Sequence, residues 1–362
     1  MTTAAADVCV VGGGPAGLAA AIAARQQGLS VVVVEAGDAP ADKCCGEGLM
    51  PDGVAALRIL GVAVPSDAAR FQGIRFIEGE RDAVGNFAGG TGAGIRRTRL
   101  HQLLLDRALE LGVDCRFQTR VTGLSGNSVA LDGGEVRSRW IVGADGYNSA
   151  VRKWSGLNAG LRHSTARRFG FRRHFQIDQT PDHVEVHWHD EFQVCVTPVG
   201  ADEVTVAMIA RHPDKRLDYA LERLPHLRRR LGPATSTERG GITGNLALPR
   251  VHRGNIALVG DASGAADSIS GEGLCLAFRE AVHLGAALAH ADLGAYAAIH
   301  PKVAWPARAM ARLLVTLAAH PALRRLALGF LQSQPAAFQA MLSAHGGEAA
   351  PFAAVAARNG LS

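Results

Sequence analysis

The sequence has few aromatic residues, few cysteines and no long apolar run, and each deficit excludes a class of protein. Aromatic residues make up 5% of the 362 residues while glycine occurs 43 times, which suits an α/β protein with many tight turns. The six cysteines form no C-x-x-C pair, so neither a zinc ribbon nor a redox dithiol is expected. No uninterrupted apolar stretch reaches about 18 residues, so we expect no transmembrane helix. The short polar start, Met1–Asp7, leaves no room for a signal peptide, and these features together predict a reduced, cytoplasmic protein.

The charge balance and the missing motifs narrow the function further. The formal net charge is +5, and no basic stripe is interleaved with aromatic residues, so we expect no nucleic-acid partner. The mild positive excess suits an anionic cofactor and is compatible with peripheral association with a membrane. The sequence contains no Ser-His-Asp nucleophile elbow and no metal-binding motif, so we expect neither a hydrolase nor a metal site.

A βαβ unit opens the chain. Asp7–Val11 and Leu29–Glu35 are apolar runs typical of buried parallel strands, and the Ala-rich segment Pro15–Gln27 between them is typical of a helix. The turn between the first strand and the helix reads Gly-Gly-Gly-Pro-Ala-Gly over residues 12–17 and matches G-x-G-x-x-G. In this context the motif predicts a dinucleotide-binding site.

Each residue of the motif has a physical role. Gly12 permits the tight turn, Gly14 lets a pyrophosphate approach the backbone, and Gly17 allows close packing of helix on strand. The helix N-terminus offers free N–H groups to the phosphates. Glu35, at the end of the second strand, can accept hydrogen bonds from ribose hydroxyls.

A second glycine-rich run, Gly89–Gly94, does not fit this pattern. No apolar strand leads into it, and no helix begins on it in the required way. We interpret it as a mobile loop near the active site and not as a second nucleotide site.

Two later strands each end in a glycine and an aspartate. Val136–Val142 leads into Gly143-Ala144-Asp145-Gly146, and Asn255–Val259 leads into Gly260-Asp261. Because ligands of open α/β sheets bind at the carboxyl ends of the strands, both carboxylates are expected beside the nucleotide. From the residues alone, either aspartate could instead cap a following helix.

With these motifs in this order, residues 5–290 resemble the FAD-dependent monooxygenases of the aromatic hydroxylase type and the related geranylgeranyl reductases. The resemblance implies that Asp261 binds the ribityl chain of FAD and that Asp145 lies near the pyrophosphate and the path of NAD(P)H. Arg97, at the start of a predicted helix over Arg97–Leu111, matches an arginine that reaches the cofactor, although it could also be a surface cation. The positions that the resemblance assigns to FAD are Gly12, Gly14, Pro15, Ala16, Gly17, Glu35, Ala36, Arg97, Val121, Asp145, Gly146, Gly260, Asp261, Gly271, Gly273 and Leu274.

The flavin ring is expected at two glycine-rich segments. In the first, Gly271-Glu272-Gly273 opens a predicted helix over Gly271–Ala289, and its N–H groups would stabilise negative charge on reduced flavin. Glu272 either faces the substrate or satisfies the turn. Just before it, Asp267-Ser268 stands where the family usually has Asp-Pro, so this turn lacks the rigidity that the proline would give.

The second segment, Lys43–Pro51, resembles the Cys-Gly segment that passes the flavin in prenyl reductases and polyketide hydroxylases. Cys45 is the matching position, and we expect Cys44 and Cys45 to be free thiols lining the pocket. The candidate catalytic residues are therefore Cys45, Gly271, Glu272 and Gly273.

The intervening stretches alternate apolar and polar residues, as half-buried antiparallel strands do. In 183–189 we expect the histidines and Glu185 to form a polar face in solvent or facing the pocket, and not a metal site. The arginine-rich stretch Arg162–His174 is interpreted as a solvated surface, or else as a site for NAD(P)H phosphates or an acidic substrate.

These elements predict a fold in three parts. A Rossmann-like α/β FAD-binding domain is expected from residues 1–70, 95–160 and 240–300. An inserted antiparallel β-sheet domain for the substrate is expected from 71–94 and 161–239, followed by C-terminal helices over 301–362.

The favoured function is an FAD-dependent monooxygenase that uses NADH or NADPH to hydroxylate a small hydrophobic substrate of aromatic or polyketide type. Two alternatives stay open: a reductase of isoprenoid double bonds and an accessory flavoprotein. A halogenase is disfavoured because no Trp-x-Trp-x-Ile motif is present.

Overall fold

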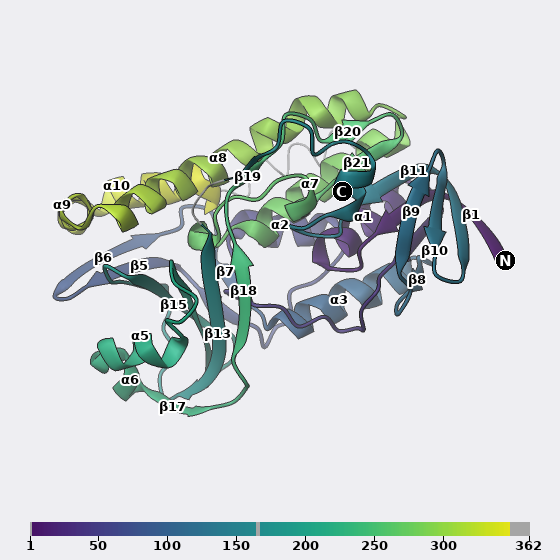
Figure 1. Ribbon diagram of the computed structural model, residues 1–362. Coiled ribbons are helices and arrows are strands. Elements are labelled where there is room, and N and C mark those ends of the chain that lie inside the picture. Colours follow the sequence, from purple (N-terminus) through teal and green to yellow (C-terminus); the bar gives the residue numbers. More distant parts are fainter. Residues whose placement is uncertain (1, 164–166, 348–362) are drawn as a thin grey trace.

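The computed structural model describes residues 2–163 and 167–347, and Figure 1 shows their arrangement. The first layer is a mainly parallel sheet in the order β20-β21-β11-β1-β2-β8, to which the antiparallel strands β10 and β9 are added beside β11. Its strands are β1 (Thr2–Val11), β2 (Val31–Val34), β8 (Asp114–Arg116), β9 (Val121–Ser125), β10 (Ser128–Leu131), β11 (Gly134–Gly143), β20 (His252–Arg253) and β21 (Ile256–Leu258). The predicted Rossmann-like fold is confirmed, and the first strand begins earlier than its apolar run suggested.

Three helices pack together beside this sheet. They are α1 (Pro15–Gln26), α3 (Arg97–Glu110) and α7 (Gly273–Ala289), and α1 contacts both of the others. Their bounds agree with the predicted helices to within one or two residues at each end. A Cβ added to Gly285 would lie 2.7 Å from the Cβ of Ala23, so small residues let α1 and α7 approach closely.

The second sheet lies at the opposite end of the molecule from the β9–β10 hairpin (Figure 1). Its order is β17-β13-β16-β15-β14-β5-β6, with β18 also paired to β13. Neighbouring strands are antiparallel except β14 and β5, which are parallel. The strands are β5 (Gly73–Glu78), β6 (Arg81–Asn86), β13 (Arg168–Ile177), β14 (Val184–Trp188), β15 (Phe192–Pro198), β16 (Glu203–Ala210), β17 (Leu231–Ala234) and β18 (Arg239–Thr243).

The expectation that β14 is half-buried is wrong. Helices α5 (Leu217–Arg223) and α6 (Pro225–Arg230) follow β16 in the chain. Glu185 and His187 lie on the face of β14 that points away from the cavity described below, and each is only 1% exposed. Arg230 of α6 forms a two-pronged ion pair with Glu185, and His187 Nε2 lies 3.0 Å from the same carboxylate. Because these polar groups satisfy one another, a strand with alternating polarity is buried on both faces.

The interpretation of Gly89–Gly94 as a mobile loop is also wrong for its second half. Gly92–Gly94 forms strand β7, which pairs with β3 (Gly48–Leu49) and β4 (Ala69–Phe71) and is buried. A Cβ on Gly94 would lie 1.7 Å from the carbonyl oxygen of Pro198. Glycine is required here because another strand passes directly over the backbone.

Short elements complete the sheet regions and connect them. They are α2 (Pro51–Ile59), α4 (Ala150–Trp154), β12 (Arg162–His163), β19 (Leu246–Ala247) and the 3₁₀ turns η1 (Gly260–Ala262) and η2 (Ser268–Ser270).

The C-terminal helices connect the two sheet regions. Helix α8 (Leu293–Ala319) packs on α7, and α9 (Pro321–Ser333) and α10 (Pro335–Leu342) pack on β6 (Figure 1). A final turn, η3 (Ser343–Gly347), contacts α2, α8 and α10. Since α8 begins at Leu293 and passes through Pro301 and Pro306, it crosses the boundary expected at residue 301.

No single helix among residues 2–163 and 167–347 is long and apolar enough to cross a membrane. Helices α8 and α9 meet the criteria of length and composition only as a pair, and the pair is bent by 119°.

Candidate active site

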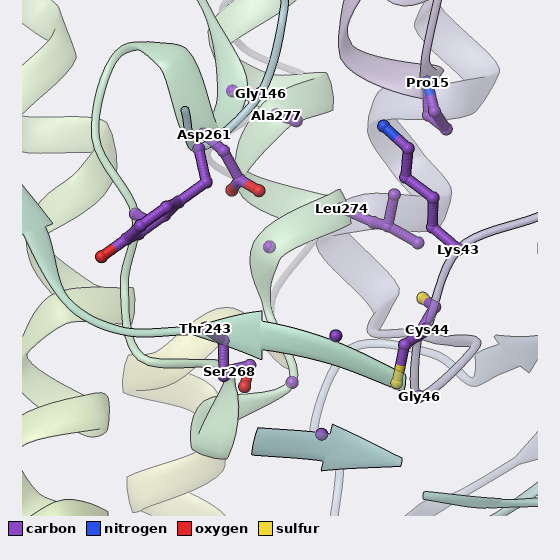
Figure 2. Close-up of a pocket in the computed structure, with 18 of the residues that line it drawn as sticks. Pro15, Lys43, Cys44, Gly46, Gly146, Thr243, Asp261, Ser268, Leu274 and Ala277 are labelled. Atoms are coloured by element: carbon purple, nitrogen blue, oxygen red, sulfur yellow. The ribbon is translucent and has the colours of Figure 1, made fainter. Parts of the chain in front are cut away.

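A cavity of about 680 Å³ lies where the parallel sheet, the second sheet and the C-terminal helices meet. Of the residues singled out from the sequence, all but Gly17 and Glu272 line it. Asp261 and Lys43 extend into this space from opposite sides of Leu274, and the Cys44–Gly46 segment borders it further along (Figure 2). The cavity therefore brings together segments that are more than 200 residues apart in the sequence.

The glycines around the cavity fall into two groups, and the difference shows what the cavity can hold. A Cβ on Gly12 or Gly17 would collide with backbone, at 2.5 Å and 1.8 Å from the nearest oxygen. In contrast, five of the glycines that line the cavity have no atom within 4 Å of a Cβ position: Gly14, Gly46, Gly146, Gly271 and Gly273. This trough of bare backbone next to the uncapped N-terminus of α1 fits the pyrophosphate and ring of FAD.

Glu35 and His101 hold the first glycine turn in place. Glu35 accepts a hydrogen bond from the N–H of Gly13 at 2.7 Å and from that of Gly37 at 2.8 Å, and it lines the cavity. The Nε2 atom of His101, a buried residue of α3, lies 2.8 Å from the carbonyl oxygen of Gly13. Burial lowers the pKa of His101, so the neutral ring donates to this carbonyl. No short motif identifies His101, because its partner is 88 residues away.

Asp145 caps α4, as the alternative interpretation of this aspartate proposed. Its carboxylate accepts hydrogen bonds from the N–H groups of Ala150 and Val151 and from the hydroxyl of Ser149. It also lines the cavity, so capping does not remove it from the cofactor region. Arg97 lies in the cavity wall and not on the outer surface, and its buried Nε has no hydrogen-bond partner among the described residues. An unpaired buried donor next to the pyrophosphate trough suits a phosphate ligand.

The side chain of Asp261 projects into the cavity and is exposed to it. Protein surrounds the carboxyl group at larger distance. Burial raises its pKa, and the carboxylate of Glu280 adds to the shift. Glu280 holds the turn beneath it, because it accepts hydrogen bonds from the N–H of Gly260 and the hydroxyl of Ser263. His300 of α8 closes this network 3.0 Å from Glu280. Neither Glu280 nor His300 was identified from the sequence, since both lie in helices of ordinary composition.

At the expected flavin position, Gly271 adopts φ +70° and α7 begins at Gly273 without a side-chain cap. Both glycines and Leu274 line the cavity. Glu272 does not: its side chain is fully buried and faces Arg279 and Asp52. The geometry therefore does not support the alternative in which Glu272 faces the substrate.

Cys44 and Cys45 both line the cavity and both are free. Burial raises the pKa of each, to about 12 for Cys44, so both are protonated thiols at neutral pH. The Sγ of Cys45 accepts a hydrogen bond from the N–H of Glu47 at 3.3 Å, which fixes the loop as it passes the cavity.

Glu47 joins several parts of the structure, and the sequence did not reveal it. It is 2% exposed and its φ is +60°. Its carboxylate accepts hydrogen bonds from the backbone N–H of Arg97, from Nε2 of His174 and from the hydroxyl of Thr205. Burial acts to raise the pKa of Glu47, but the hydrogen bonds from His174, Thr205 and the Arg97 backbone outweigh it and lower the pKa. Glu47 thus joins the cofactor loop, α3 and the second sheet.

The expectation that Arg162–His174 is a solvated surface is wrong for two of its arginines. Arg168 and Arg172 are 5% and 1% exposed because β13 faces the cofactor domain. Arg168 Nε lies 2.7 Å from Asp267, whose second oxygen caps η2, and Arg172 pairs with Asp42. The Arg168 pair fixes the turn in which the expected Asp-Pro is absent.

Part of the cavity lining beyond Gly271 and Gly273 is mainly apolar. The residues that form this chamber come from β4, β5, β14, α8 and α10: Phe71, Ile74, Phe76, Val184, Val186, Met310, Leu314, Met341 and Leu342. Gln193 and Thr197 of β15 and His345 of η3 contribute polar side chains to the same cavity lining. The described residues contain no cluster able to hold a metal ion.

Comparison with known proteins identifies the family. Residues 5–297 match the family model described as FAD binding domain. The chain belongs to this family of FAD-dependent oxidoreductases. The flavoprotein is 30% identical over 300 residues to menaquinone reductase from Mycolicibacterium smegmatis, a match that covers 74% of this chain and 73% of that protein. It is 26% identical over 302 residues to digeranylgeranylglycerophospholipid reductase from Methanocella arvoryzae, with coverage of 74% and 73%.

The fold of the flavoprotein is shared with solved monooxygenases. The p-nitrophenol 4-monooxygenase from Pseudomonas putida superposes with a TM-score of 0.80 and 19% identity, covering 96% of this chain and 99% of that one. Anhydrotetracycline hydroxylase from Streptomyces rimosus gives a TM-score of 0.75 and 22% identity, covering 94% and 76%. At these identities the likeness shows the fold alone. The predicted family and fold class are confirmed.

Proposed function

We propose that this FAD-dependent oxidoreductase reduces a carbon–carbon double bond in the isoprenoid chain of a small lipophilic substrate. The observation that carries the proposal is the apolar chamber, whose walls continue directly from the flavin-facing glycines Gly271 and Gly273. An isoprenoid chain offers only apolar surface, and such a chamber binds it by burying that surface. Met310 and Met341 in the wall suit a flexible chain, since methionine adapts to irregular shapes.

The sequence relatives favour reduction over hydroxylation. The two relatives named above, whose matches each cover 74% of this chain, are a menaquinone reductase and a digeranylgeranylglycerophospholipid reductase. Rifampicin monooxygenase from Streptomyces venezuelae is 32% identical, but over 42% of this chain and 34% of its own length. Hydroxylation of an aromatic or polyketide-like substrate, which the sequence favoured, is therefore kept as the competing reaction.

The residues of the chain have separable roles in this proposal. Bound FAD supplies the two electrons. The free N–H groups at the start of α7 stabilise negative charge at the cofactor, while Asp261 and Arg97 hold its ribityl and phosphate parts. Cys45 contributes a neutral thiol to the wall between the cofactor and the chamber. Phe71 and Phe76 exclude water from the chamber.

NADH or NADPH is the proposed reductant of the cofactor. Lys43, Arg97 and Arg120 line the cavity on its nucleotide side, where they would attract a dinucleotide carrying phosphates. Flavin bleaching by NADH and by NADPH, each followed without oxygen, tests this part independently of the substrate.

The deciding experiment is anaerobic turnover of the FAD-loaded protein with menaquinone or a geranylgeranyl lipid. The proposal expects a product that has gained two hydrogen atoms and that forms equally well without oxygen. A product that has gained one oxygen atom, formed only in air, would establish the competing hydroxylation.

We further propose that the protein meets its substrate at a membrane surface. Trp305 of α8 and Leu326 and Phe330 of α9 are 66%, 72% and 56% exposed, and Arg81 and Arg325 lie beside the last two. Large apolar side chains next to basic ones are typical of helices that lie in a membrane interface. The inner face of α8 lines the chamber through Met310 and Leu314, so one helix would face both the lipid and the site.

A further inference from the structure

A buried group of ionisable side chains lies against the flavin-facing turn. Its members are at most 8% exposed and come from α2, from the start of α7 and from η3: Asp52, Glu272, Cys275, Arg279 and His345. Glu280 and His283, further along α7, are the next ionisable groups near Arg279. The chemistry described so far uses none of the group.

The contacts within the group are unequal. Arg279 Nη1 lies 3.0 Å from Asp52 Oδ2, whereas its Nη2 is 3.6 Å from Glu272 Oε2. The other Glu272 oxygen lies 3.6 Å from His345 Nε2. Neither oxygen of Glu272 has a hydrogen-bond partner among residues 2–163 and 167–347. Gly346 packs directly on the carboxyl group, because a Cβ there would lie 2.5 Å from Oε1.

Counting charges shows that this group carries one proton that can move. Two carboxyl groups face one guanidinium, and Asp52 has the closer contact with it. An ionised Glu272 would then be a buried anion without a full partner, which is strongly unfavourable. One further proton must therefore reside on Glu272 or on His345.

The two sites differ in how well they hold that proton. Burial raises the pKa of Glu272 well above its ordinary value, and the nearby Asp52 adds to the shift. Burial, together with Arg279, lowers the pKa of His345 to about 4. At rest the proton is thus on the carboxyl group of Glu272 and the imidazole is neutral.

His345 connects this proton to the chamber. The imidazole lines the cavity together with Met341 and Leu342 and with Gly271 of the flavin-facing turn. We propose that Glu272 and His345 share one proton and that His345 passes it to the substrate in the chamber. The inference deepens the proposed function and rests on it: His345 becomes a catalytic residue, and Glu272 a positioning residue that stores the proton.

The step balances as an addition of hydride and proton. Reduction of a double bond adds a hydride, which bound and reduced FAD would supply, to one carbon and a proton to the other. As the new C–H bond forms, the N–H bond at one ring nitrogen of His345 breaks and its electron pair stays on that nitrogen, while Nε2, which faces Glu272, takes up the carboxyl proton. The ring therefore stays neutral, and the Glu272 carboxylate that results recovers a proton from water.

The experiment uses the full-length FAD-loaded protein and the variants Glu272→Gln and His345→Gln. His226→Gln serves as the matched control, since His226 is exposed on α6, away from the cavity lining. Infrared spectroscopy should show a protonated carboxyl C=O band in the wild type that Glu272→Gln removes and His226→Gln keeps.

Single-turnover oxidation of the reduced enzyme by menaquinone, without oxygen, should be about 100-fold slower in His345→Gln, as expected when a general acid is lost. Flavin reduction by dithionite should be unchanged.

The outcomes separate the two proposals. Absence of the band in the wild type, or its persistence in Glu272→Gln, overturns the shared proton. A His345→Gln rate within about 2-fold of wild type overturns its delivery by His345. If the wild type reduces no isoprenoid substrate, the proposed function fails, and the band still decides whether the proton is shared. If His345→Gln does not fold, the band and the rate of Glu272→Gln, expected to fall about tenfold, decide.

Discussion

The carboxylate of Glu47 lies 2.7 Å from Nε2 of His174 and joins the cofactor loop to the second sheet across 127 residues of sequence. Glu47 follows Cys45 by two positions, and its carboxylate also receives the backbone N–H of Arg97. The loop that contains Cys45 and Glu47 is therefore held by the second sheet as much as by its own domain. Movement of one part relative to the other would strain this contact.

Replacing Glu47 by alanine should destabilise the protein by about 3 kcal/mol, because the buried imidazole of His174 and the nearby Arg172 would lose their shared partner. The free energy of unfolding in urea, measured with FAD present and absent, checks this. Glu110→Ala is the control, since Glu110 forms an exposed pair with Arg107 on α3 and should change stability by less than about 0.5 kcal/mol. Equal effects of the two substitutions would contradict the role given to Glu47.

Much of the nucleotide side of the site could be predicted because its residues act through the local backbone. Gly12, Gly14 and Gly17 belong to one turn between a strand and a helix, and the spacing of the three glycines indicates that geometry. Asp145 and Asp261 follow apolar strands, and parallel strands bring their carboxyl ends to one edge.

The residues that were missed act through partners far away in the sequence. Glu47, His101 and Glu280 each depend on a contact that only the folded chain creates, so no short pattern marks them. The polarity of β14 and the arginines of β13 were misjudged for a related reason. A charged side chain looks like a surface residue until its buried partner is known, and α6 and η2 supply those partners to Glu185 and Arg168.

Replacing Gly14 by valine should abolish FAD binding while leaving the fold intact. Gly14 has φ −70°, which valine tolerates, and nothing lies within 4 Å of its Cβ position, so the side chain would extend into the cofactor's space. Flavin absorbance after incubation with excess FAD and gel filtration measures binding, and circular dichroism measures folding. Gly329→Ala is the control, because this glycine of α9 also has open space around it but lies away from the cavity. Retention of FAD by the valine variant would place the pyrophosphate elsewhere.

Replacing Cys45 by serine should keep FAD bound and lower substrate-dependent turnover by about tenfold. The thiol lines the cavity, and its raised pKa keeps it neutral, so the change alters polarity there without adding charge. Turnover is compared with flavin content for each preparation. Cys115→Ser, in β8, is the control because Cys115 does not line the cavity. A loss of FAD in the Cys45 variant would instead indicate a structural role.

Acid should destabilise the second sheet through Glu185. Burial acts to raise the pKa of Glu185, but hydrogen bonds from His187 and Arg230 outweigh it and lower the pKa from 4.5 to about 2. A carboxyl group whose folded-state pKa is depressed stabilises the fold above its unfolded pKa, and this contribution is lost as the pH falls toward the folded value. Urea unfolding between pH 6 and pH 2 should therefore show a decline below about pH 4.5 that is shallower in Glu185→Gln. An identical pH dependence in the two proteins would contradict the assignment.

Vesicle binding should depend on the exposed face of α9. Leu326 and Phe330 together present two large apolar side chains to solvent, and inserting each into a membrane interface stabilises binding by about 1.5 kcal/mol or more. The double change Leu326→Ser and Phe330→Ser should therefore weaken co-sedimentation with anionic vesicles by at least about tenfold. Arg325→Gln should weaken it by a smaller factor and only when anionic lipid is present, because a basic side chain near the surface contributes about 1 kcal/mol and Arg325 also contacts Glu78.

Leu109→Ser is the control for vesicle binding, since Leu109 is 52% exposed on α3. Failure of the wild type to bind anionic vesicles would exclude a membrane role for this surface, and equal weakening by the Leu109 variant would show that binding is not confined to α9.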